Sequence, residues 1–136
     1  MSEASRNTPS RILAFAAVVE FGTGLVLMID PVIVVTLLLG TEVSGTATLL
    51  ARCFGIALLA LGLACWPSEQ RAERGSPAFP GMLTYNVLIA LYLAYVGTAG
   101  HLRGVLLWPA VGLHALVALL LVWTGRDEGR MKATDI

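Results

Sequence analysis

Each of four strongly apolar stretches of this chain contains a side chain that can carry charge or protons: Glu20, Arg52, Tyr92 and His114. A charged side chain at the centre of an apolar segment costs roughly 2.5 kcal/mol or more on membrane-insertion scales, so such a residue needs a partner or a function. Carboxylates and imidazoles transfer protons, and an arginine can neutralise a carboxylate. These residue types therefore indicate either a proton or cation site or an ion pair that fixes the helices.

The four side chains are predicted to lie within one layer between the outer leaflet and the midplane, where the long Arg52 side chain can reach deeper than its backbone. Counting helical rise inward from the expected outer boundary places Glu20 and His114 at ~14 Å, Tyr92 at ~10 Å and Arg52 at ~8 to 9 Å. We therefore expect a Glu20–Arg52 ion pair, with His114 and Tyr92 in the same buried polar cluster. Two interpretations stay open: a proton site with His114 as relay, or a structural ion pair with His114 bonded to a carbonyl or a tyrosine.

A second polar group, Tyr85 and Asn86, is predicted to lie lower than this cluster, toward the opposite side of the membrane. Four small residues mark expected helix contacts, because they let two helix backbones approach closely: Gly24, Ala51, Gly55 and Gly62. They would serve either close packing within the chain or a homodimer face.

The elements that position these residues are four apolar stretches, at about 11–29, 47–66, 80–99 and 105–124. The chain is 57% hydrophobic and only 13% charged, against about a quarter charged in soluble domains. Each stretch is long enough to cross a bilayer core of ~30 Å. The sequence therefore predicts an all-α polytopic integral membrane protein, with residues 1–136 forming a single transmembrane domain of four helices in an antiparallel bundle.

The segment after the first stretch is too short to span a membrane. We expect a short interfacial or re-entrant helix at 31–39 on the outer face, with Asp30 as N-cap, Pro31 at its first position and Gly40 at its end. The alternative is one long kinked helix over 11–39.

Basic residues predict the orientation. Seven of the nine lie in segments that would share one side: Arg6, Arg11, Arg71, Arg74, Arg126, Arg130 and Lys132. By the positive-inside rule, both termini are cytoplasmic and the location is a bacterial-type inner membrane.

Several functions find no support in the residues. The net charge is zero, which gives no field for nucleic acid. The two histidines, His101 and His114, are ~20 Å apart along one helical arm, so they cannot both ligate one haem within a subunit. No serine lies in a span, and no metal-ligand spacing occurs. We therefore expect no enzyme activity, no cofactor and no metal.

The leading interpretation is a non-catalytic accessory subunit or assembly component of a larger membrane complex. Its partners would be the lipid bilayer and either other membrane subunits or further copies of the chain. The alternative is a small proton-coupled transporter or channel that uses Glu20 and His114. A haem- or quinone-binding redox subunit is the third candidate.

The segment at 17–25, AVVEFGTGL, resembles the first helix of the small multidrug resistance transporters. That resemblance implies that Glu20 exchanges protons for cationic drugs within an antiparallel dimer. It covers about ten residues, and the chain departs from the family in Arg52, in its third stretch and in its charge bias. The general shape also resembles that of the DoxX-like four-span bacterial proteins, a resemblance that implies no site.

Overall fold

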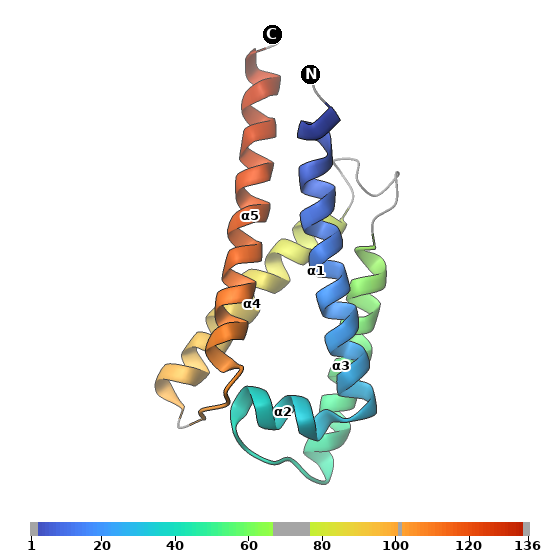
Figure 1. Cartoon of the computed structure of the whole chain (residues 1–136), viewed down its shortest axis with the longest axis vertical. Helices are drawn as coiled ribbons and strands as arrows, with labels where there is room; N and C mark the ends of the chain where they lie inside the picture. Colours follow the sequence, from blue (N-terminus) through green and yellow to red (C-terminus); the bar gives the residue numbers. More distant parts are fainter. Residues whose placement is uncertain (1–2, 67–76, 101, 135–136) are drawn as a thin grey trace.

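Helices make up most of the chain that the computed structural model describes, residues 3–66, 77–100 and 102–134. Side chains are described within 10–125 of those ranges. The helices, in chain order, are α1 Glu3–Ile29, α2 Pro31–Leu39, α3 Thr46–Ala64, α4 Ala78–Ala99 and α5 Leu107–Thr134 (Figure 1). No strand occurs in these ranges, which confirms the predicted all-α class.

Four helical segments are long and apolar enough to cross a membrane. Their bounds, each within two residues of those predicted, are Ser10–Ile29, Thr46–Ala64, Ala78–Ala99 and Leu107–Gly125. Two of the helices continue beyond the apolar segment, since α1 begins at Glu3 and α5 ends at Thr134. Hydropathy marks only where a helix can meet lipid, whereas the helix itself continues as long as its backbone hydrogen bonds do.

Helices α1 and α3 pack closely and run antiparallel. A Cβ added at Gly24 would lie 2.6 Å from the Gly55 carbonyl oxygen, and one at Gly62 would lie 2.8 Å from the Ala17 carbonyl oxygen. At Gly24, Gly55 and Gly62, a side chain larger than hydrogen would fit only if the two helices moved apart. Three of the four predicted packing residues therefore serve contacts within the chain rather than a homodimer face, and Ala51 is half-buried beside them.

Helices α4 and α5 form the second antiparallel pair. Gly97 near the end of α4 lies against Trp108 near the start of α5, and Phe79 near the start of α4 lies against Gly125. The two pairs touch each other far less extensively, mainly through α1 and α5. The molecule thus consists of two tight helix pairs with a loose interface between them (Figure 1).

Helix α2 is a separate helix, so the alternative of one long kinked helix is wrong. Asp30 leaves helical geometry with φ −136° and ψ 84°, and its carboxylate accepts hydrogen bonds from two backbone amides of the first turn. Pro31 occupies the first position, and Gly40 ends the helix in the left-handed conformation at φ 72°. Asp30, Pro31 and Gly40 therefore have the capping roles that the sequence predicts.

Helix α2 lies across one end of the molecule and bridges the two pairs (Figure 1). The Leu106 amide, just before α5, donates a hydrogen bond of 2.8 Å to the Leu37 carbonyl oxygen. Gly104 lies directly against the backbone of Leu38, where a Cβ would overlap it. The chain ends lie at the opposite end of the molecule.

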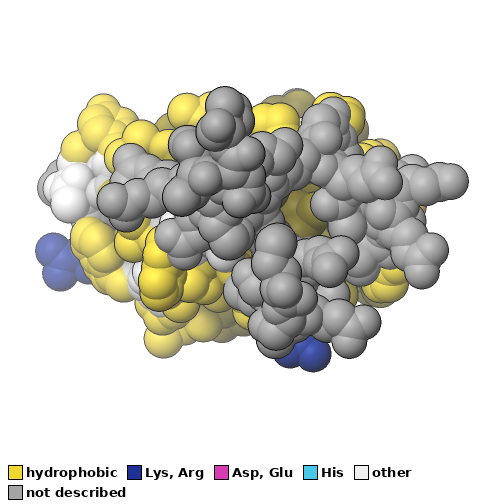
Figure 2. Space-filling view, turned by 90° about the horizontal axis from the view of Figure 1, so that it is seen from above, with side chains coloured by type: hydrophobic (Ala, Val, Ile, Leu, Met, Phe, Trp, Pro, Cys, Tyr) yellow, Lys and Arg dark blue, Asp and Glu magenta, His cyan; other side chains and the backbone are white. Residues whose placement is uncertain are grey.

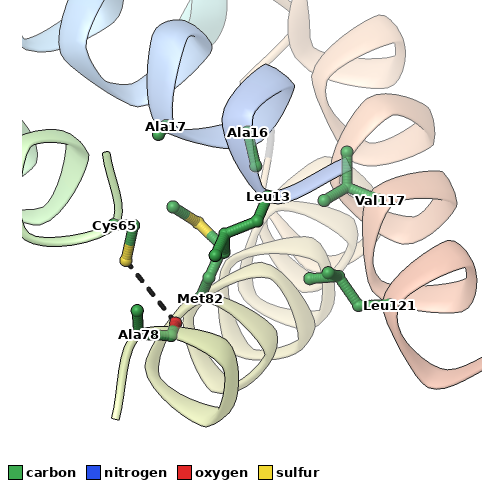
Figure 3. Close-up of a cluster of buried hydrophobic side chains, with 8 residues drawn as sticks. All are labelled: Leu13, Ala16, Ala17, Cys65, Ala78, Met82, Val117 and Leu121. Carbon is green, nitrogen blue, oxygen red and sulfur yellow. Dashed lines mark hydrogen bonds between the residues drawn. The ribbon is translucent and has the colours of Figure 1, made fainter. Parts of the chain in front are cut away.

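The described core is a compact cluster of buried apolar residues at the end where the chain begins and finishes (Figure 3). Its members, drawn from α1, α4, α5 and the end of α3, are Leu13, Ala16, Ala17, Cys65, Ala78, Met82, Val117 and Leu121. The Cys65 thiol donates to the Ala78 carbonyl oxygen at 3.5 Å, which joins the end of α3 to the start of α4.

The outer surface is largely apolar. Viewed along the molecule, hydrophobic side chains cover much of the described surface (Figure 2). Large residues such as Ile29, Leu91 and Leu119 are more than 60% exposed. The charged connection at 67–76 and the side chains of Arg6, Arg126, Arg130 and Lys132, on which the predicted orientation depends together with Arg11, lie outside the described residues.

Candidate functional site

The carboxylate of Glu20 is buried between the two helix pairs. The residue is only 2% exposed although it lies in the middle of α1. Its carboxylate accepts a hydrogen bond from the Tyr85 hydroxyl of α4. Its Oε1 lies 3.7 Å from Nδ1 of His114 on α5. Glu20 therefore faces the opposite helix pair rather than its own partner α3.

Asn86 fixes the orientation of His114. The Asn86 amide nitrogen donates to the Met82 carbonyl oxygen at 2.9 Å, which turns the amide oxygen toward α5. That oxygen lies 2.9 Å from Nδ1 of His114, so Nδ1 must carry the hydrogen that is donated. In the neutral ring, Nε2 is then the acceptor nitrogen. Within the described residues, no hydrogen bond engages Nε2.

Helix α4 supplies two adjacent residues to this site. Tyr85 and Asn86 point about 100° apart around the helix axis, so one reaches Glu20 while the other reaches His114. The Tyr85 ring also meets the His114 ring edge-on, with centroids 5.8 Å apart and an interplanar angle of 82°. The result is a polar cluster of Glu20, Tyr85, Asn86 and His114, which we call the four-residue cluster.

The predicted Glu20–Arg52 ion pair is wrong, because the two residues lie at different levels of the α1/α3 pair. Gly24 faces Gly55 in antiparallel register, which puts Arg52 level with Leu27. Glu20 is seven residues away from that level, or ~10 Å along the helix. Arg52 is exposed, and the described residues form no ion pair between it and Glu20.

The predicted place of Tyr92 in the cluster is also wrong. Tyr92 is 62% exposed, two turns beyond Tyr85 along α4. Tyr85 and Asn86, predicted to form a separate lower group, instead complete the site. Asn86 shares the buried face of α4 with Met82 and Ala90, one turn away on either side, but α4 is apolar all round, so its sequence does not mark that face.

A cavity of about 560 Å³ adjoins the four-residue cluster between the helix pairs. Its wall comes from all five helices and is mostly aliphatic. The residues that line it are Val19, Glu20, Gly22, Thr23, Val26, Leu27, Ile33, Val34, Leu37, Leu38, Phe54, Leu58, Tyr85, Ile89, Leu93, Leu106, Pro109, Ala110, Leu113 and His114. Its volume falls within the range of small-molecule binding sites, about 300 to 1,000 Å³.

The cavity has a polar end and an apolar end. Along α1 its lining runs from Glu20 to Leu27, and along α5 from His114 to Leu106, where α2 crosses. These spans correspond to ~10 to 12 Å of helix. Lining residues near α2, such as Ile33 at 52% and Phe54 at 45%, are well exposed, whereas Glu20 is buried. The cavity therefore opens near α2 and deepens toward Glu20.

The buried apolar cluster of Figure 3 closes the far side of the polar end. Leu13 and Ala17 lie on α1 one to two turns beyond Glu20, and Val117 and Leu121 lie on α5 beyond His114. Glu20 thus lies between an open apolar cavity and a packed apolar plug. No polar path continues through the described core in this conformation.

The site has no arrangement for a metal. No group of three His, Cys, Asp or Glu side chains within the described residues is placed to hold an ion. His101, considered above as a haem ligand, lies outside the described residues. Searches found no match to a protein family, a curated protein or a solved structure.

Proposed function

We propose that this protein is a small integral membrane protein that binds a lipophilic small molecule between its two helix pairs. The observation that carries the proposal is the cavity of about 560 Å³, whose aliphatic wall ends at Glu20, Tyr85 and His114. A pocket with an apolar wall and a few convergent polar groups is the usual form of a ligand site.

The membrane setting is part of the proposal. Four apolar helices and an apolar surface support a four-span antiparallel bundle, with α2 lying at the outer interface. Both termini would then lie in the cytoplasm of a bacterial-type inner membrane, as the positive-inside rule predicts. In that orientation the mouth of the cavity faces the outer leaflet, from which a lipophilic molecule can enter.

Because Glu20 and Arg52 form no ion pair, the sequence no longer favours an accessory subunit over a protein that binds or transports a ligand. In the leading interpretation from the sequence, an accessory subunit, Glu20 has a structural role in an ion pair with Arg52. The carboxylate instead lines a cavity, with a tyrosine and a histidine of the other helix pair beside it. Membership of a larger complex stays a prediction, and a ligand-binding subunit would satisfy both interpretations.

Proton-coupled transport is the second candidate, and one observation favours it. Glu20 and His114 lie between the open cavity and the apolar plug. A transporter that opens alternately to each side of the membrane would need its gate at this place. The sparse contact between the helix pairs would allow them to rock apart. Flux of protons in liposomes that depends on Glu20 tests this candidate.

Photolabelling tests the proposed binding. The protein in lipid nanodiscs is irradiated with a diazirine analogue of octanol, and labelled residues are located by mass spectrometry. We expect saturable labelling at the lining residues, including Glu20 and Tyr85, that excess octanol suppresses. Labelling that never saturates and spreads evenly over the lipid-facing residues would overturn the proposal.

A pair of matched variants locates the effect. Ala110→Phe places a ring inside the cavity, whereas Ala60→Phe places the same ring on the exposed face of α3. We expect the first variant to lose the saturable labelling and the second to keep it. Equal labelling in both would show that the cavity is not the site.

A further inference from the structure

We infer that the ligand's head group is a hydrogen-bond donor, such as the hydroxyl of a lipophilic alcohol or phenol or the ammonium of an alkylamine, and that Glu20 and Nε2 of His114 accept its hydrogens. This inference rests on the proposed function. It concerns the chemistry of the polar end of the same cavity and follows from counting which hydrogens the four-residue cluster has already used.

The hydrogen-bond donors of the four-residue cluster already donate to acceptors within the cluster or to the backbone of α4. The Tyr85 hydroxyl donates to the Glu20 carboxylate, and Nδ1–H of His114 donates to the Asn86 oxygen. The Asn86 amide in turn donates to the Met82 carbonyl oxygen. A hydroxyl has one hydrogen and a neutral imidazole has one, so neither Tyr85 nor His114 retains a hydrogen for the cavity.

The acceptors of the cluster are in surplus. A carboxylate offers about four lone-pair sites, and the described interactions of Glu20 use one hydrogen, that of Tyr85. Nε2 of His114 has a lone pair that no described group engages. Acceptors that face the cavity can take hydrogens from a ligand, so a ligand that supplies hydrogens is favoured over one that brings more acceptors.

The charged groups around Glu20 also favour a ligand that donates hydrogens. Within the described residues, the basic group within 4.0 Å of the Glu20 carboxylate is His114, at 3.7 Å, and its Nδ1 hydrogen goes to Asn86. Arg52, the basic residue predicted to neutralise Glu20, lies at another level. Thr23, which also lines the cavity, can donate as well as accept, but it lies one turn nearer to α2. The deepest part of the cavity is therefore an acceptor site.

The length of the cavity sets the apolar part of the ligand. The lining of ~10 to 12 Å between the polar end and α2 suits an alkyl chain or a substituted ring. A quinol, which donates two hydroxyl hydrogens, fits this rule, whereas the corresponding quinone, which only accepts, does not.

The matched pair of para-octylphenol and its methyl ether isolates the effect of the donated hydrogen, since the two compounds share one apolar body.

Competition against the diazirine–octanol label tests the inference. We expect the phenol to suppress labelling of the cavity at a concentration about tenfold lower than the ether, since one hydrogen bond to a carboxylate accounts for about that factor. In Glu20→Gln, whose amide can both donate and accept, that ratio should fall toward one. The ratio within each protein cancels differences in how the competitors partition into lipid.

The outcomes separate this inference from the proposed function. If neither competitor affects labelling and labelling does not saturate, the cavity is not a ligand site. If both compete equally, the cavity binds lipophiles but the donor rule is wrong. Competition by octylamine stronger than by the phenol would identify the donor as a cationic head, and the reverse would identify a neutral hydroxyl. The ratio of phenol to ether concentration is measured in the unmodified protein, so it is informative even if Glu20→Gln does not fold.

Discussion

At the scale of single residues, the arrangement around Glu20 rests on hydrogen bonds rather than on an ion pair. Tyr85 binds the carboxylate, while Asn86 orients His114 and is itself only 1% exposed. A carboxylate that is held by neutral donors and opens to a cavity can still interact with a ligand. One paired with an arginine would already be neutralised.

A double-mutant cycle distinguishes these two arrangements. Glu20→Gln and Arg52→Gln should have additive effects on the free energy of unfolding, within about 0.3 to 0.5 kcal/mol, because the two side chains share no contact. Glu20→Gln and Tyr85→Phe should instead couple by roughly 0.5 kcal/mol or more, because they share a hydrogen bond. Denaturation in detergent micelles measures both cycles. Coupling between Glu20 and Arg52 would contradict the observed register.

At the scale of elements, the register of α1 on α3 decides what Glu20 can meet. That register depends on glycines that let the two backbones touch. A Cβ at Gly24 would lie 2.7 Å from the Leu59 amide nitrogen and 2.6 Å from the Gly55 oxygen. Both of those neighbours are backbone atoms, which cannot rotate away as a side chain could.

Alanine at this contact should therefore destabilise the protein. Gly24→Ala is expected to cost about 1 to 3 kcal/mol, as overpacked sites do. Gly22→Ala, two residues away on the same helix, meets nothing within 4 Å and should be neutral or stabilise by up to about 1 kcal/mol through helix propensity. Thermal unfolding in detergent compares the two. Similar losses for both variants would mean that α1 and α3 are not in this contact.

The short helix α2 is held at its start by a side-chain cap. Asp30→Ala removes the acceptor of the Val32 and Ile33 amides, at 3.2 and 3.3 Å, and should weaken α2 by about 1 kcal/mol. We expect amide hydrogen exchange in α2 to rise roughly fivefold, because 1 kcal/mol changes an opening equilibrium by about that factor. Glu42→Ala, at an exposed position just after α2, is the control. Unchanged exchange in Asp30→Ala would show that the cap does not hold the helix.

At the scale of the whole molecule, two helix pairs enclose a cavity that is bridged by α2 at one end and closed by the apolar core at the other. This arrangement concentrates tight packing within each pair and leaves the space between them partly unfilled. A soluble protein would collapse such a space under the hydrophobic effect. In a bilayer, lipid is as apolar as the side chains, and that driving force is missing.

The orientation of the whole molecule gives the last prediction. A green fluorescent protein fused after the C-terminus should fluoresce, and alkaline phosphatase at that place should be inactive, because the C-terminus is predicted to be cytoplasmic. Alkaline phosphatase fused after Glu42, at the α2 end, should be active. The reverse pattern would invert the molecule and turn the mouth of the cavity toward the cytoplasm.

The sequence alone determined the class and the elements of this protein. Runs of apolar residues identify the four membrane-spanning segments within two residues, and the Asp30–Pro31 pair with Gly40 identifies α2. These features are local, because helix formation and capping depend on neighbours within a few residues. Glu20 and His114 were also recognised, since a polar residue in an apolar run is evident without any contact information.

Only the tertiary structure decided which polar residues meet. Arg52 and Glu20 are predicted in one layer of the membrane, but an apolar run gives depth only to about a turn and gives no rotation about the helix axis. The register set by Gly24 and Gly55 places Arg52 away from Glu20. Tyr85 and Tyr92 lie on nearly the same face of α4, but Tyr85 is level with Glu20, whereas Tyr92, two turns further along, is 62% exposed. Such choices depend on close packing between helices far apart in the chain, and a shift of one turn, 5.4 Å, is enough to exchange one partner for another.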